Sequence, residues 1–260
     1  MNPFPIDSFA YGNRLRRVAA SEKMLFGAGL VALAIGFKSL ALSAVIIATV
    51  TAILHLRAGI SVRDFWGFLW LPAGFILVGV VPMAIEVVGP TTPGVLGTMT
   101  IGPWTLGVTA RAAAQAGAIL ASSFGSVAGT LFLALTTPMV DLTDQLRRWH
   151  VPALLVEMMM LVYRFIFVLL ETAGAMRTAQ EVRLGYSSRA RWLRSIGMLA
   201  SNLYLRSQRR ADLLFTALSC RGYTGELRVL VDPAPWSGVH VAGIVGLLAA
   251  LAAFGMVVAA

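Results

Sequence analysis

The sequence has little charge, one cysteine and three histidines. Charged residues make up 13% of the 260 residues, whereas a water-soluble domain carries about a quarter. The single cysteine, Cys220, excludes an internal disulfide framework and a cluster of thiolate ligands. The histidines, His55, His150 and His240, lie far apart along the chain, which argues against a histidine metal site. These shortages exclude the usual soluble and disulfide-rich classes, and we expect no metal ligands in this chain.

Lysine is also scarce, and this bears on nucleotide chemistry. A phosphate-binding loop needs the sequence Gly-Lys followed by Ser or Thr. The two lysines, Lys23 and Lys38, follow Glu22 and Phe37 instead. We therefore expect no cofactor and no catalytic residue in this chain, so any ATP and Mg²⁺ would belong to partner subunits.

What the chain has in abundance is apolar sequence. Hydrophobic residues make up 58% of it, the mean hydropathy is +0.79, and a helix needs about 20 apolar residues to cross a bilayer. The pattern predicts an all-α integral membrane protein with about five spans. The expected spans are 19–37, where Lys23 would extend to the interface, 39–56, 65–88, 104–137 and 237–260.

Small residues and helix breakers punctuate these runs. Two prolines and four glycines lie in 89–102, which predicts a loop between the third and fourth spans. Gly125 and Gly129 form a GxxxG spacing that permits close helix contact, although an apolar helix with no specific partner fits the spacing equally well.

The net charge of +9 is distributed very unevenly. Residues 172–230 hold ten arginines and three acids, a net charge of +7. Because arginine and lysine gather on the cytoplasmic side, this block and the basic amino end are expected there. The sequence thus predicts a membrane domain over 1–137, a cytoplasmic module over 138–236 and a last span over 237–260.

This topology requires that the apolar run 153–170 does not cross the membrane. His150, Glu157, Arg164 and Glu171 lie seven residues apart, which would place all four on one face of a helix. A polar seam of this kind suits a helix at the interface or against other helices. We expect two long helices in the module, one over 153–184 and one over 190–220, the second of which could be broken.

The two expected helices end alike. The first end has Ala179, Arg183 and Gly185, and the second has Ala217, Arg221 and Gly222; a Tyr follows each glycine. Arginine in a last turn complements the helix dipole and glycine caps the end, so one copy alone would be ordinary capping. Two copies indicate a function, because an exposed guanidinium at a helix end can insert into a groove on a partner protein.

These ends resemble those of the transmembrane coupling subunits of energy-coupling-factor (ECF) transporters, the EcfT family. Further matches point to its cobalt-type branch, CbiQ, and they cover nearly the whole chain. They are Ile6-Asp7, 13–16 and Lys23, then 135–138, Arg147-Arg148 and Val151-Pro152, then 163–165 and Glu171. The Val182-Arg183-Leu184-Gly185 order departs from the family's simplest Ala-Arg-Gly form.

The resemblance implies a scaffold in an ATP-driven importer, for cobalt or nickel ions, in the cell inner membrane. Arg183 would meet one cytoplasmic ATPase subunit and Arg221 the other, and a separate membrane subunit would bind the substrate. The soft apolar surface of the first helix would hold that subunit, through Met158, Met159, Leu161 and Phe165. Ordinary helix packing explains the methionines equally well.

Three other functions compete with this one. Asp141 and Asp144 are spaced to hold Mg²⁺ for phosphotransfer in a membrane enzyme, but no further carboxylate lies in 145–156. The arginines would suit binding of anionic lipid or nucleic acid, although we expect no nucleic-acid partner. The permease half of an ordinary ABC importer would carry one short coupling loop in place of two long helices.

Overall fold

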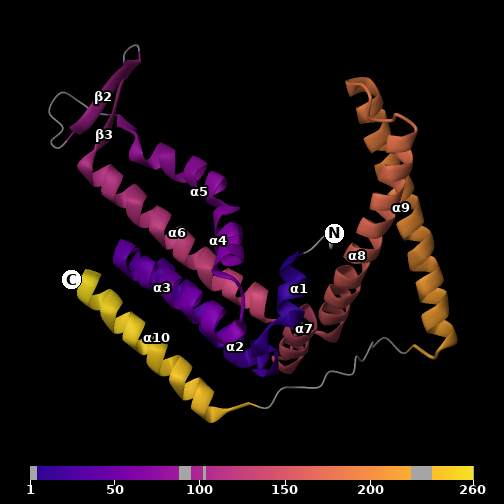
Figure 1. Ribbon diagram of the computed structural model, residues 1–260, viewed down its shortest axis with the longest axis horizontal. Coiled ribbons are helices and arrows are strands. Elements are labelled where there is room, and N and C mark those ends of the chain that lie inside the picture. The colour runs from indigo at the N-terminus through magenta and orange to yellow at the C-terminus, as the bar shows by residue number, and fades with distance from the viewer. Residues whose placement is uncertain (1–4, 88–94, 102–103, 224–235, 260) are drawn as a thin grey trace. The chain divides into compact units, whose positions relative to one another are not determined.

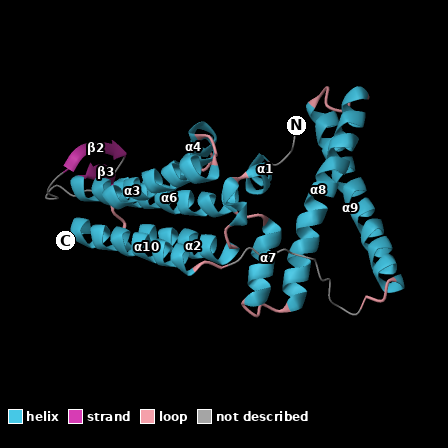
Figure 2. Ribbon diagram, turned by 60° about the horizontal axis from the view of Figure 1, so that its bottom comes forward, coloured by secondary structure: helices cyan, strands magenta, loops and turns pink. Residues whose placement is uncertain are grey.

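The computed structural model describes residues 5–87, 95–101, 104–223 and 236–259, and within them the chain is helical except for one small sheet (Figures 1 and 2). The predicted class, an all-helical membrane protein, is confirmed. The chain divides into two compact units. One comprises 4–138 with 233–260, and the other comprises 139–232 with 1–3.

The first unit, called the membrane unit below, holds most of the apolar helices. Its helices are α1 (Pro5–Gly12), η1 (Arg14–Arg17), α2 (Ala20–Phe37), α3 (Leu40–Ile53), η2 (Leu54–Ala58), α4 (Val62–Trp70), α5 (Ala73–Val80), η3 (Val81–Ala84), α6 (Ala110–Thr136) and α10 (Gly238–Ala259). Its strands are β1 (Glu86–Val87), β2 (Val95–Ile101) and β3 (Trp104–Thr109).

Five helices are long and apolar enough to cross a membrane, namely α2, α3 continued by η2, α6, α8 (Ala153–Val182) and α10. The bent pair of α4 with α5 and η3 would make a sixth. The range 65–88 was predicted as one span, and an interpretation of it as one continuous helix is wrong. The pair bends by 40° at the break before Ala73, where Pro72 cannot donate the backbone hydrogen bond that a straight helix needs.

The start of the predicted fourth span is also wrong. Trp104–Thr109 forms β3, and α6 begins at Ala110, where the Thr109 hydroxyl accepts a hydrogen bond of 3.1 Å from the Ala112 amide. β3 pairs antiparallel with β2 and β1, in the order β1-β3-β2. The prediction of a loop over 89–102 therefore fails for Val95–Ile101, and the rest of that range lies outside the described residues.

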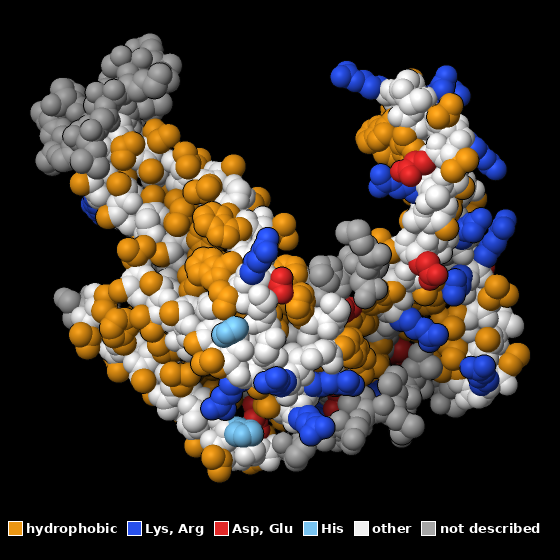
Figure 3. Space-filling view, viewed as in Figure 1, with side chains coloured by type: hydrophobic (Ala, Val, Ile, Leu, Met, Phe, Trp, Pro, Cys, Tyr) orange, Lys and Arg blue, Asp and Glu red, His pale blue; other side chains and the backbone are white. Residues whose placement is uncertain are grey.

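The core of this unit forms where α6 packs against α2 and α3, with α10 against α2. Phe26, Leu30, Ile46 and Phe132 are among its buried side chains. The space-filling view shows hydrophobic side chains spread over the outside of the unit as well (Figure 3). Apolar side chains outside and inside suit a helix bundle whose solvent is lipid.

The GxxxG spacing on α6 is a site of close helix contact. A Cβ on Gly129 would lie 3.1 Å from Val31 Cγ2 and 3.3 Å from the Gly27 carbonyl oxygen. A Cβ on Gly125 would lie 3.3 Å from Ser43 Cβ. The two glycines thus let the backbones of α6, α2 and α3 approach closely, as the spacing predicted.

Two adjacent charged side chains at the start of α2 tie together the ends of other helices. The buried Lys23 ammonium donates to the Thr136 carbonyl oxygen at 2.9 Å, at the end of α6. The buried Glu22 carboxylate accepts from the Ser237 amide at 2.8 Å, where α10 begins, and His240 Nδ1 lies 3.3 Å from its second oxygen. The positive charge of Lys23 lies at the negative, C-terminal end of α6, and the negative charge of Glu22 lies at the positive, N-terminal end of α10. The Lys23 side chain is therefore buried among helix ends within the protein, and the expectation that it extends to the membrane interface stays a prediction.

Lys23→Met should lower the stability of the purified protein by about 1–3 kcal/mol, because buried carbonyl oxygens lose their donor. Lys38→Met is the matched control, since Lys38 is exposed, and it should leave the stability nearly unchanged. Thermal unfolding of both variants in detergent measures the difference. Equal melting temperatures would show that Lys23 has no anchoring role.

Candidate functional site

The second unit consists of three helices, α7 (Met139–Arg148), α8 (Ala153–Val182) and α9 (Arg189–Cys220). α9 is continuous through Gly197, so of the two possibilities left open by the sequence the unbroken helix is the one that forms. The predicted polar seam of four residues is wrong for His150, which precedes α8 and has φ of +60°. Glu157, Arg164 and Glu171 do lie on α8.

The ends of α8 and α9 have the same backbone geometry. At the end of α8, the Leu184 amide donates to Glu181 and the Gly185 amide to Gln180, at 3.0 and 2.8 Å. The equivalent bonds at the end of α9 run from Gly222 to Ser219 and from Tyr223 to Leu218, both at 3.1 Å. This pair of bonds is the Schellman motif, which satisfies the last helical carbonyls without a side chain.

Arg183 and Arg221 therefore occupy the same position, the C-cap, in two copies of one motif. The residue that follows each arginine is left-handed, with φ of +54° at Leu184 and +75° at Gly222. Gly222 is thus the predicted cap, whereas Gly185 is one residue too late to be one. The inserted Leu184 takes the left-handed position, so the departure from the family's simplest form does not shift the arginine.

Gly185 has a different reason to be glycine. A Cβ there would lie 2.7 Å from Ser195 Oγ and 2.9 Å from the Gln180 carbonyl oxygen. The same buried Ser195 donates to the Gly185 carbonyl oxygen at 2.9 Å and accepts from Gln180 Nε2 at 3.0 Å through its own carbonyl. Tyr186 OH donates to Gln180 Oε1 at 2.7 Å. These bonds fix the turn between α8 and α9.

Both guanidinium groups are exposed and available to a partner. Within the described parts of the chain, neither Arg183 nor Arg221 has a hydrogen bond or an ion pair from its side chain. Ala179 and Ala217 lie one turn before them and are also exposed. Their small side chains leave space on the same helix face beside each arginine. Figure 3 shows that Lys and Arg side chains are frequent over this unit.

A second hydrogen bond ties the end of α9 to α8. Tyr223 OH donates to Glu157 Oε1 at 2.5 Å, and the Glu157 side chain is buried. This bond raises the pKa of Tyr223, because ionisation of the hydroxyl would remove a donor and place two negative charges together. The hydroxyl therefore remains a donor throughout the neutral range.

The predicted substrate-subunit residues divide between two faces of α8. Leu161 and Phe165 line a groove toward α9, whereas Met158 is 52% exposed on the outside and Met159 is partly buried. The exposed face continues as one stripe, which we call the α8 stripe. It consists of Leu155, Met158, Val162, Ile166 and Leu170. Its spacing of three and four residues is a helical period, so the sequence could have revealed Val162 and Ile166.

The acidic pair on α7 is engaged in contacts within the protein. Asp144 accepts a hydrogen bond of 3.0 Å from Arg148 Nε, one turn later, and Asp141 also has a partner. No group of three or more His, Cys, Asp or Glu side chains that could hold a metal ion occurs among the described residues.

Comparison with known proteins agrees with this architecture. The chain is a multi-pass helical membrane protein with a separate helical unit that ends in paired arginine motifs. The family model described as cobalt transport protein, CbiQ, matches residues 12–231, and the chain belongs to this family of membrane cobalt transport proteins.

Individual relatives cover nearly the full length. The chain is 36% identical to cobalt transport protein CbiQ of Rhodobacter capsulatus, over 96% of this chain and 97% of the relative. It is 31% identical to cobalt transport protein CbiQ of Salmonella typhimurium, over 86% and 99%. It is also 30% identical to a putative fused cobalt transport protein CbiMQ of Methanocorpusculum labreanum, over 85% of this chain and 36% of that longer protein.

Gly185→Ala should destabilise the turn between α8 and α9 by about 1–3 kcal/mol, because the new methyl group overlaps Ser195 and Gln180. Gly174→Ala is the matched control, since a Cβ there meets nothing within 4 Å and alanine favours a helix. Thermal unfolding, with limited proteolysis at the turn, measures both variants. If Gly185→Ala is as stable as the control, Ser195 and Gln180 do not pack closely against Gly185.

Proposed function

We propose that this chain is the transmembrane coupling subunit of an ECF-type ATP-driven importer for cobalt ions, or for nickel. The observation that carries the proposal is the pair of exposed arginines at equivalent C-caps of α8 and α9. Membership of the CbiQ family supports it. In this role the chain is not an enzyme, and partner subunits bind ATP and Mg²⁺ and hydrolyse the nucleotide.

Each arginine is suited to insert into a groove of a cytoplasmic ATPase subunit. The Schellman bonds already satisfy the last carbonyls of both helices, so the guanidinium donors remain for a partner. A guanidinium presents five donors in a rigid planar fork, which suits carboxylates and backbone carbonyls in such a groove. Arg183 would meet one ATPase and Arg221 the other.

The topology proposed for this function places α7, α8 and α9 on the cytoplasmic side, together with the amino terminus, in the cell inner membrane. α8 is apolar enough to span a bilayer, but it packs against α7 and α9 of its own unit. The net charge of +7 over 172–230 supports a cytoplasmic position for the segment after α8.

Motion of the ATPases would reach the membrane through the bonds that join α8 and α9. The network of Gln180, Ser195 and Tyr186 holds the turn at one end of the pair. The bond from Tyr223 to Glu157 holds the end of α9 against α8. A displacement of either arginine therefore acts on both helices, and ATP-driven closure would pull the two helices together.

The α8 stripe is the proposed contact with the substrate-binding membrane subunit. It keeps Met158 among the residues expected from the sequence and adds Val162 and Ile166. Leu161, Phe165 and Met159 would then act mainly in packing beside it. The fused relative, whose printed name joins CbiM and CbiQ in one chain, supports a membrane partner of this kind.

Charge reversal at both arginines should abolish ATPase association. In the double variant Arg183→Glu, Arg221→Glu, each groove contact becomes repulsive, so capture of the ATPase subunits and cobalt uptake should fall at least tenfold. Arg63→Glu, the same change at an exposed site in the membrane unit, should bind normally. Co-purification of the coexpressed complex measures both. Normal ATPase capture and uptake by the double variant would refute the coupling role.

A charge in the α8 stripe should release the substrate subunit and leave the ATPases bound. The double variant Val162→Asp, Ile166→Asp places two carboxylates where an apolar contact is proposed, so capture of the membrane partner should fall about tenfold or more. Leu205→Asp on α9 is the control, because Leu205 is similarly exposed, at 52%. Retention of the substrate subunit by the double variant would show that this stripe faces lipid or solvent instead.

A further inference from the structure

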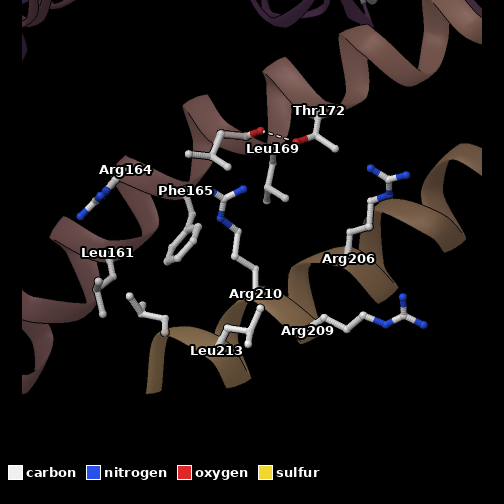
Figure 4. Close-up of a pocket in the computed structure, with 11 residues that line it drawn as sticks. Leu161, Arg164, Phe165, Leu169, Thr172, Arg206, Arg209, Arg210 and Leu213 are labelled. Carbon is white, nitrogen blue, oxygen red and sulfur yellow. Dashed lines mark hydrogen bonds between the residues drawn. The ribbon is translucent and has the colours of Figure 1, made fainter. Parts of the chain in front are cut away.

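A groove of about 590 Å³ runs between α8 and α9, and its lining is both apolar and strongly basic (Figure 4). α8 supplies mainly apolar side chains, among them Leu161, Phe165 and Leu169, together with Arg164. α9 supplies Arg206, Arg209 and Arg210 together with Leu213 and Leu214. The only polar group of α8 in the groove besides Arg164 is the Thr172 hydroxyl, which already donates to the Val168 carbonyl oxygen at 2.8 Å.

The charge in this groove is not balanced by the protein. No acidic side chain is among the lining residues. Within the described ranges, none of the four guanidiniums has a hydrogen-bond or ion-pair partner. Elsewhere in the same unit, Arg148 and Arg177 each contact a carboxylate one turn away, at 3.0 and 2.8 Å.

Arg209 and Arg210 lie three and four residues after Arg206, so both neighbour Arg206 on the helix surface. Figure 4 shows Arg210 directed toward α8, beside Phe165 and Leu169, whereas the Arg209 side chain extends along the outside of α9. Like charges at this spacing repel one another. An anion between them would relieve the repulsion and accept several charge-assisted hydrogen bonds.

We propose that this groove binds an anionic phospholipid, with its phosphate on Arg206, Arg209 and Arg210 and an acyl chain along Leu161, Phe165 and Leu169 of α8. A ligand that matches this lining carries a negative charge for the arginines and an apolar part for the leucines and Phe165. Clusters of arginine on a helix with an apolar face at the cytoplasmic side of a membrane attract anionic lipid headgroups. The site is separate from the two helix-end arginines and does not depend on the coupling role.

The test measures lipid bound to the purified full-length chain by native mass spectrometry, with phosphatidylglycerol and phosphatidylcholine of identical acyl chains as probes. We expect at least tenfold preference for phosphatidylglycerol. In the triple variant Arg206→Gln, Arg209→Gln, Arg210→Gln this preference should disappear. The control Arg189→Gln, Arg191→Gln, Arg194→Gln removes three arginines of the same helix outside the groove and should keep the preference.

Further measurements distinguish a bound lipid from free phosphate and show whether the variants still fold. Inorganic phosphate at millimolar concentration should not displace phosphatidylglycerol, and Phe165→Ser should weaken lipid binding although no charge changes. Arg206→Lys, Arg209→Lys, Arg210→Lys keeps the charge and should retain the preference, which shows that the groove still folds.

Three results would overturn the proposal. Equal loss in the glutamine triple and its control would mean a general attraction to the basic unit. Displacement by inorganic phosphate would mean a simple anion site. Unchanged lipid preference in the glutamine triple, with loss of a coexpressed partner subunit, would mean that an acidic protein segment occupies the groove.

Discussion

The satisfaction of helix ends is the constraint on which the rest of this structure depends. Each helix leaves carbonyls and amides without internal partners, and in an apolar bundle water does not supply them. At one end of the membrane unit, neighbouring side chains of opposite sign meet this need. Lys23 donates to the end of α6 and Glu22 accepts from the start of α10. Three helices are thereby held at fixed relative positions.

In the second unit, backbone bonds meet the same need at the C-terminal ends of α8 and α9, and the proposed function depends on this. Because Schellman bonds satisfy the last carbonyls of α8 and α9, Arg183 and Arg221 are not used for capping. They are exposed at equivalent positions, as the proposed attachment to two ATPase subunits requires. The left-handed Leu184 preserves this equivalence at a small conformational cost, of about 1 kcal/mol.

Most of the helices were predictable, because a long apolar run indicates a helix and a glycine after it indicates where the helix ends. α8 and α9 fall within one or two residues of the predicted ranges. What the sequence did not predict has different causes. Trp104–Thr109 continues an apolar run, and a short apolar run fits a strand as well as a helix; here it pairs with the neighbouring strand β2. Lys23 donates to the Thr136 carbonyl oxygen, 113 positions away, and a contact over that distance leaves no periodic signal in the local sequence.

By itself the sequence determined the class of the protein, the concentration of arginine after α8, and the repeated helix ends. These features arise from composition, charge and local spacing, which each segment carries without its neighbours. Tertiary structure decided which groups are left over. It buried Glu157 against Tyr223 and left the arginines of the groove without a carboxylate. Whether a charged group is satisfied or available depends on what packs against it, and only the folded chain brings those groups together.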